Sequence, residues 1–245
     1  MASTENPNRH LVLIGVGPGI GRSVARLFAA RRYNHVTLIA RRAEQLKTEQ
    51  AEVEAATQSQ TQTQTQTQTQ TIKVKTYAVD VADSSALTDT LVDAEATLGK
   101  PECVYFNAAR VVPSRLLGHD VKDIEYDFKL TVSALYVTAQ WAMPSLVELA
   151  KTDPVARPVF AVTGGVLHVE PDPELFALSL VKAAQRNLVQ SLALSYGPLG
   201  VRVGMILVRG FVGPDKEESN PENIAKRAWE WLSNEDEGPF EITIG

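Results

Sequence analysis

Glycines near the start of the chain have a spacing that indicates phosphate chemistry. They follow an apolar run, residues 11–14, and precede a stretch with helical periodicity that we expect to extend to Arg32. Glycine permits a tight turn, and the backbone N–H groups at a helix N-terminus can hold a pyrophosphate. The order of strand, glycine turn and helix therefore predicts a nucleotide-binding site. Its candidate residues are Gly15, Gly17, Gly19, Ile20 and Gly21.

Further polar residues follow other predicted strands. In a parallel α/β sheet, ligands bind at the carboxyl ends of the strands, so these residues are expected to lie at the same site as the glycines. Two arginines follow the strand at 35–40, an Asp-Val pair follows the strand at 72–79, and an Asn-Ala-Ala run follows the strand at 103–106. The residues are Arg41, Arg42, Asp80, Val81, Asn107, Ala108 and Ala109.

The elements that must position these residues alternate along the chain. Strand patterns occur at 11–14, 35–40, 72–79, 103–106, 158–162, 201–208 and 240–244. Helical patterns occur at 20–32, 43–56, 84–98, 121–149, 173–196 and 221–232, with Pro144 as an expected kink or boundary. This alternation predicts an α/β fold. We expect a single doubly wound Rossmann-type domain over residues 1–245, with a mainly parallel seven-stranded sheet and helices on both faces.

Residues 57–71 are almost pure alternating Thr and Gln. Such a tract cannot bury apolar surface and carries no charge, so we expect a disordered or weakly ordered surface insertion between the second helix and the third strand.

Composition excludes several functional classes. The 245 residues carry a net charge of −5, which argues against a protein that binds nucleic acid or a membrane surface by electrostatics. No apolar run is long enough to span a bilayer, and residues 1–10 have no apolar secretory core. The single cysteine, Cys103, fits a reducing compartment. We expect a cytoplasmic protein with a small-molecule substrate and no metal site.

Several of these residues together resemble the short-chain dehydrogenase/reductase family, over essentially the whole chain from Arg9. Gly15 with Gly19-Ile20-Gly21 matches the family's first motif, and Asp80 matches its adenine-contacting aspartate. Asn107-Ala108-Ala109 is similar to its Asn-Asn-Ala-Gly motif. Lys182 matches the lysine of Tyr-x-x-x-Lys, which implies that it contacts the nicotinamide ribose and is a catalytic residue.

The end of the second strand indicates which cofactor is preferred. An acidic residue there would bind the ribose 2′-hydroxyl of NAD, but this chain has Ala40 followed by Arg41 and Arg42. A guanidinium group binds a phosphate in bidentate fashion, so we predict NADP, with Arg22 as a second candidate for the phosphate contact. The alternative is that the arginines stay solvated and that Asp80 only caps a turn.

Other positions depart from the family pattern. Leu178 stands where the resemblance implies the proton-donating tyrosine, and Gly165 stands where it implies the serine. The position of the family's asparagine falls on Thr131, and Arg209-Gly210 replaces a Pro-Gly pair. Leucine has no proton to donate, so reduction of an ordinary ketone by the family's mechanism is not expected.

Three functions fit a dehydrogenase without this acid. The first is reduction of an imine or iminium ion, whose cation is held by a carboxylate; His168, Glu170 and Asp172 are the candidate residues. This pattern is similar to fungal secondary-metabolism members that reduce an iminium ion and then shape a Diels–Alder cyclisation, as in alkaloid biosynthesis. The second is a carbonyl reductase with His168 or Asp172 as a relocated proton donor. The third is an inactive NADP-binding sensor or partner protein. Asp172 before Pro173 could instead be a helix N-cap.

The helix at 173–196 also carries more apolar residues than one buried face requires. They are Leu175, Leu178, Val181, Leu188, Leu192 and Leu194. We expect a homodimer or homotetramer, with the alternative that these residues cover the sheet.

Overall fold

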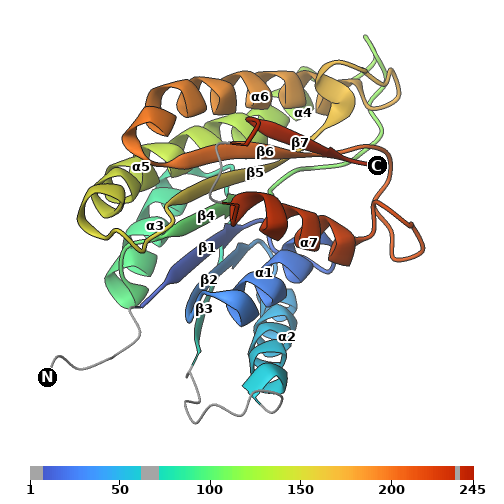
Figure 1. Ribbon diagram of the computed structural model, residues 1–245. Helices are drawn as coiled ribbons and strands as arrows, with labels where there is room; N and C mark the ends of the chain where they lie inside the picture. The colour runs from blue at the N-terminus through green and yellow to red at the C-terminus, as the bar shows by residue number, and fades with distance from the viewer. Residues whose placement is uncertain (1–7, 62–71, 235–237) are drawn as a thin grey trace, which may run out of the picture.

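The computed structural model describes residues 8–61, 72–234 and 238–245 (Figure 1). Seven strands form one sheet in the order β3-β2-β1-β4-β5-β6-β7, and every neighbouring pair is parallel. This confirms the predicted doubly wound α/β fold. The strands are β1 (His10–Ile14), β2 (His35–Ala40), β3 (Lys73–Ala78), β4 (Cys103–Phe106), β5 (Val159–Gly165), β6 (Arg202–Val208) and β7 (Glu241–Ile244).

Helices cover both faces of the sheet (Figure 1). One face packs against α1 (Ile20–Arg31), α2 (Ala43–Thr61) and α7 (Pro221–Leu232). The other packs against α3 (Ser84–Leu98), α4 (Val121–Phe128), α5 (Ala134–Thr152) and α6 (Phe176–Tyr196). Strands β1 and β4 are buried at every residue because helices cover both of their faces, which explains their continuous apolar sequence. No helix among the described residues is long and apolar enough to cross a membrane.

From β1 the sheet grows through β2 and β3 on one side, and through β4 and the later strands on the other. The order in which strands are added therefore reverses direction between β1 and β4. Such a switch point opens a crevice at the carboxyl ends of the two strands, since their connections leave in opposite directions. The glycine turn after β1 and the Asn107 loop after β4 both lie at this point. The topology therefore brings these two predicted motifs together.

The helical region predicted at 121–149 differs from expectation. Pro144 lies inside α5 and does not end it, so the predicted boundary there was wrong. The irregularity instead occurs at Lys129–Ser133, a π-helical segment between α4 and α5 in which the Ala134 N–H donates to the Lys129 carbonyl. Segments of this kind are frequent at functional sites. Thr131 lies in this segment and is buried.

The Thr/Gln tract begins differently from the prediction of disorder. Helix α2 continues past Ala56 to Thr61, because glutamine is a good helix former and α2 has no terminating residue at this point. The Thr57 hydroxyl donates to the Glu54 carbonyl at 2.8 Å. Residues 62–71 and 1–7 lie outside the described residues, so the expectations for them stay predictions.

Candidate active site

A cleft of about 570 Å³ opens at the carboxyl ends of β1, β4, β5 and β6. It is lined by the glycine turn, by the loop after β4, by the end of β5 and by the start of α6. Of the predicted site residues, nine line it: Gly15, Gly17, Gly19, Ile20, Gly21, Asn107, Ala109, Asp172 and Lys182. The structure thus brings segments more than 160 residues apart in sequence to one cleft.

The glycine turn is closely packed on one side and open on the other. Gly15 has a φ of +89°, and a Cβ there would lie 2.4 Å from the backbone nitrogen of Ala108. A Cβ on Gly21 would lie 2.9 Å from the Gly15 carbonyl oxygen. At Gly19, by contrast, no heavy atom lies within 4 Å of the Cβ position. Gly15 and Gly21 are required by packing, whereas Gly19 leaves room for a ligand against the first turn of α1.

The loop after β4 holds this turn in place. The Asn107 side-chain amide donates to the Gly15 carbonyl at 2.9 Å, and its backbone N–H donates to the Ile14 carbonyl at 2.7 Å. Ala108 is buried behind Gly15 and does not line the cleft, while the exposed Ala109 does. Asn107 therefore holds the glycine turn against the end of β4.

Arg41 and Asp80 meet at a residue that the sequence did not indicate. The Arg41 guanidinium donates to the Tyr126 hydroxyl at 3.1 Å, and that hydroxyl donates to the Asp80 carboxylate at 2.8 Å. Burial and the Asp80 carboxylate raise the pKa of Tyr126. The other Asp80 oxygen accepts from the Ala82 N–H, as the turn alternative expected. Tyr126 lies on α4, 85 residues from Arg41, so only the tertiary structure could place it here.

The remaining predicted residues at this end differ in their surroundings. Arg42 is exposed, and Val81 is buried in the core between the sheet and α3. Arg22 forms a bidentate ion pair with Glu49, at 2.7 and 2.9 Å, and Glu49 is fully buried. Since that pair already uses the Arg22 guanidinium, Arg41 is the better placed of the two for a ribose phosphate.

At the other end of the cleft, Lys182 is buried and held by two acceptors. Its ammonium group donates to the Thr163 carbonyl at 3.0 Å and to the Gln185 side chain at 2.8 Å. Burial lowers the pKa of Lys182 to about 8. Leu178 lines the cleft one helical turn before Lys182, and Gly165 lines it at the end of β5. Gln185, like Tyr126, was not indicated by the sequence.

Asp172 is the acidic side chain that lines the cleft. The interpretation of Asp172 as a helix N-cap is wrong: α6 begins at Phe176, and its N-cap position is Leu175. One Asp172 carboxylate oxygen accepts from the Glu174 N–H at 2.9 Å, forming a turn before the helix. That turn fixes the carboxylate at the cleft while leaving its second oxygen for a ligand.

His168 and Glu170 do not line the cleft. The His168 Nδ1–H donates to the Gly165 carbonyl at 2.9 Å. Glu170 is exposed and forms an ion pair with Arg209 at 2.5 Å, which lowers the pKa of Glu170. Of the three polar residues predicted in this loop, the structure brings only Asp172 to the cleft.

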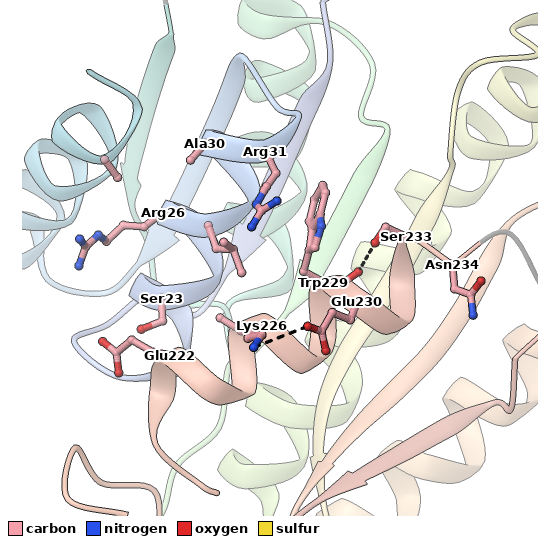
Figure 2. A pocket seen from close by; sticks show the side chains of 13 residues that line it. Ser23, Arg26, Ala30, Arg31, Glu222, Lys226, Trp229, Glu230, Ser233 and Asn234 are labelled. Carbon is pink, nitrogen blue, oxygen red and sulfur yellow. Dashed lines mark hydrogen bonds and ion pairs between the residues drawn. The ribbon is translucent and has the colours of Figure 1, made fainter. Parts of the chain in front are cut away.

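A larger hollow of about 860 Å³ lies between α1 and α7 (Figure 2). Its charged groups are partly paired within the protein, as Lys226 is with Glu230 at 3.9 Å. Trp229 packs edge-on against Phe28 at 5.1 Å between ring centroids. This groove contains no strand end and no residue of the glycine turn, so we assign the active site to the smaller cleft.

The cleft, together with Arg41, Tyr126 and Asp80 outside its lining, fits a dinucleotide. The open position at Gly19, the Arg41–Tyr126–Asp80 chain and the Lys182 ammonium would hold the pyrophosphate, the adenosine end and the nicotinamide ribose in turn. Within the described ranges, no cluster of side chains has the composition of a metal site.

Comparison with known proteins agrees with this geometry. The sequence model of a short-chain dehydrogenase family, described as enoyl-(acyl carrier protein) reductase, matches residues 15–228. An uncharacterized oxidoreductase of Schizosaccharomyces pombe is 28% identical over 128 residues, which span 51% of this chain and 46% of that protein.

Solved structures share the fold. The alcohol dehydrogenase of the archaeon Thermococcus sibiricus, complexed with 5-hydroxy-NADP, superposes with a TM-score of 0.79 at 17% identity, covering 97% of this chain and 96% of that one. An NADH-dependent reductase, A1-R′, complexed with NAD, has a TM-score of 0.74 at 13% identity, covering 90% and 87%. With a matching family model over most of its length, the chain belongs to the short-chain dehydrogenase/reductase family, whose members are oxidoreductases that use NAD or NADP.

Proposed function

We propose that the protein is an NADPH-dependent reductase of cyclic imines or iminium ions. The observation that supports this proposal is the pair of side chains at the catalytic end of the cleft: Leu178 at the position of the proton donor, and Asp172 with a free carboxylate oxygen. Such chemistry fits the secondary metabolism suggested by the resemblance to iminium-reducing members of the family.

The chain's own residues would act through binding and charge. Arg41 would hold the 2′-phosphate of the cofactor, and Lys182 would hold the nicotinamide ribose. When bound, NADPH supplies a hydride. Asp172 would lie against the positive carbon–nitrogen group of the substrate and orient it. An iminium ion is neutralised by reduction, and an imine reaches that state by taking a proton from water before the hydride is transferred, so Leu178 does not have to supply a proton, unlike the donor that a ketone requires.

The experiment that tests this proposal compares NADPH oxidation with cyclic iminium salts and with ketones of the same size. We expect turnover only with the cations. Asp172→Asn keeps the turn to Glu174 but removes the charge, and we expect kcat/KM to fall about 10- to 100-fold. Glu174→Gln is the matched control, because that exposed carboxylate lies two residues from Asp172 and does not line the cleft. Equal activity with ketones, or an unaffected Asp172→Asn variant, would contradict the proposal.

The two other functions give different results in the same assay. Tight NADPH binding without oxidation by any acceptor would indicate a sensor or partner protein. Ketone turnover that is lost in Asp172→Asn would indicate a relocated acid. The geometry favours Asp172 over His168 for that role, because His168 does not line the cleft.

A further inference from the structure

Exposed apolar side chains gather on three loops around the cleft. We call these loops the collar: residues 107–120, 166–175 and 209–220. Thirteen large apolar side chains are exposed among the described residues, and six of them belong to the collar. They are Val111, Leu116, Leu117, Val169, Phe211 and Val212, of which Leu117 is 97% and Phe211 73% exposed. Such a concentration on loops, which are usually polar, indicates a binding surface.

The structure ties the three loops to one another. Ser114 pairs with Leu175 as a parallel β-bridge, and the Ser114 N–H donates to the Glu174 carbonyl at 2.7 Å. The Arg209–Glu170 ion pair joins the second loop to the third. Figure 1 shows the first two loops side by side at one end of the sheet. The three loops of the collar are therefore connected to one another.

This surface continues into the cleft. Val111, Phe211 and Val212 are exposed and also line the cleft. Deeper in, the lining near Lys182 is again mostly apolar, with Val166, Leu167, Leu175, Leu178 and Val208. The same cleft is thus lined by exposed apolar side chains of the collar, by less exposed apolar side chains and by Asp172 and Lys182.

We propose that the substrate is a large, mainly apolar molecule whose body is held by the collar while its reacting group lies at Asp172. That the reacting group is charged rests on the proposed function, whereas the apolar body of the substrate is inferred from the collar. A small polyol would leave the collar exposed to water, whereas an apolar body would cover it. Burial of each methylene group strengthens binding about fourfold.

The test is a series of N-alkyl dihydroisoquinolinium ions with methyl, butyl and octyl chains. Their dissociation constants are measured on the NADP-bound full-length protein by displacement of the neutral apolar dye Nile red, and kcat/KM is measured with NADPH. We expect the dissociation constant to fall with chain length, by up to about fourfold for each methylene that the collar buries. In Phe211→Ser the dissociation constant should depend less on the length of the alkyl chain. Val92→Ser is the matched control, because Val92 is also exposed but lies on α3 outside the collar.

The binding measurement separates this inference from the proposed function. A chain-length dependence without hydride transfer would support the apolar substrate and contradict the reductase. No chain-length dependence, or the same dependence in Phe211→Ser as in Val92→Ser, would overturn the inference. If Phe211→Ser instead lowers the sedimentation coefficient and no chain-length dependence is seen, the collar is an interface between copies of this chain.

Discussion

The Tyr126 hydroxyl connects Arg41 and Asp80, the two residues predicted to contact the adenosine end of the cofactor. It accepts from Arg41 and donates to Asp80, so both residues are held in one chain of hydrogen bonds. An exposed arginine loses side-chain entropy when it binds a phosphate. A fixed partner reduces that loss, since part of the ordering is already present in the free protein.

We therefore expect separate effects from two substitutions. Arg41→Ala should weaken NADPH binding about 10- to 100-fold while changing NADH binding little, because only NADPH carries the 2′-phosphate. Tyr126→Phe should weaken NADPH binding about 2- to 10-fold, since Arg41 remains but is less ordered. Calorimetric titration of each variant with NADPH and NADH measures both effects.

Tyr77→Phe is the control for the hydroxyl deletion. Tyr77 also donates to an aspartate at 2.7 Å, but that aspartate is Asp93 on α3 and not Asp80. Tyr77→Phe should leave the affinity for NADPH and for NADH unchanged. If Arg41→Ala weakened NADPH and NADH equally, the assignment of Arg41 to the phosphate would be wrong.

At the scale of elements, α4 links the loop after β4 to Arg41 and Asp80. Arg110 forms ion pairs with Asp127 at 2.6 Å and with Asp123 at 3.0 Å, and its guanidinium lies 5.4 Å from the centre of the Tyr126 ring. Asp127 is almost fully buried, so this pairing satisfies a carboxylate that water does not reach. The π-helical segment after α4 changes the direction of the side chains between α4 and α5, because it adds a residue to one turn.

Helix α6 shows which part of its apolar surface covers the sheet. Leu188 and Leu192 pack against the core beside the sheet, so the alternative of sheet cover accounts for them, while Leu180 and Leu194 are 44% and 74% exposed. We propose that these exposed residues, with Tyr136 on α5, contribute to a homodimer or homotetramer. Sedimentation velocity over a concentration series should show self-association that Leu194→Glu weakens. A monomer at every concentration in the unsubstituted protein would contradict this.

At the scale of the whole molecule, one buried histidine joins β1, β2 and the residue that follows α3. The His10 Nδ1–H on β1 donates to the Gly99 carbonyl after α3 at 2.6 Å, and its Nε2 accepts from the Thr37 hydroxyl on β2 at 2.8 Å. Burial lowers the pKa of His10 to about 4. The folded protein therefore favours the neutral ring.

This pKa predicts a loss of stability in acid. Between about pH 6.5 and pH 4 the unfolded state binds a proton that the folded state does not, so the free energy of unfolding falls as the pH falls. From pH 7.5 to pH 4.5 the contribution of His10 to this decrease should be about 2.5 kcal/mol. Urea unfolding of the protein and of His10→Gln at both pH values measures it. His168→Gln, a control outside the core, should show the same decrease in the free energy of unfolding between the two pH values as the unsubstituted protein. If His10→Gln also showed that full decrease, His10 would not be its cause.

The sequence by itself determined the fold class, the order of the elements and the family. These features follow from local patterns, because a strand covered on both faces is continuously apolar and a phosphate-binding turn needs glycines directly after it. The glycine turn, Asn107 and Lys182 could be predicted because each lies next to a recognisable strand end or motif. The departures at Leu178 and Gly165 were also visible in the sequence.

Only the tertiary structure decided which side chains meet at the cleft. Arg41 and Tyr126 are 85 residues apart, and the Arg209–Glu170 pair spans 39. No local sequence pattern predicts such pairs, since they depend on how the helices and loops pack. The same holds for Asp172 and His168, four residues apart on one loop, where a single turn places the carboxylate in the cleft and the imidazole outside it. Periodicity assigns residues to elements; the direction of a loop side chain is set by backbone hydrogen bonds that form only in the folded chain.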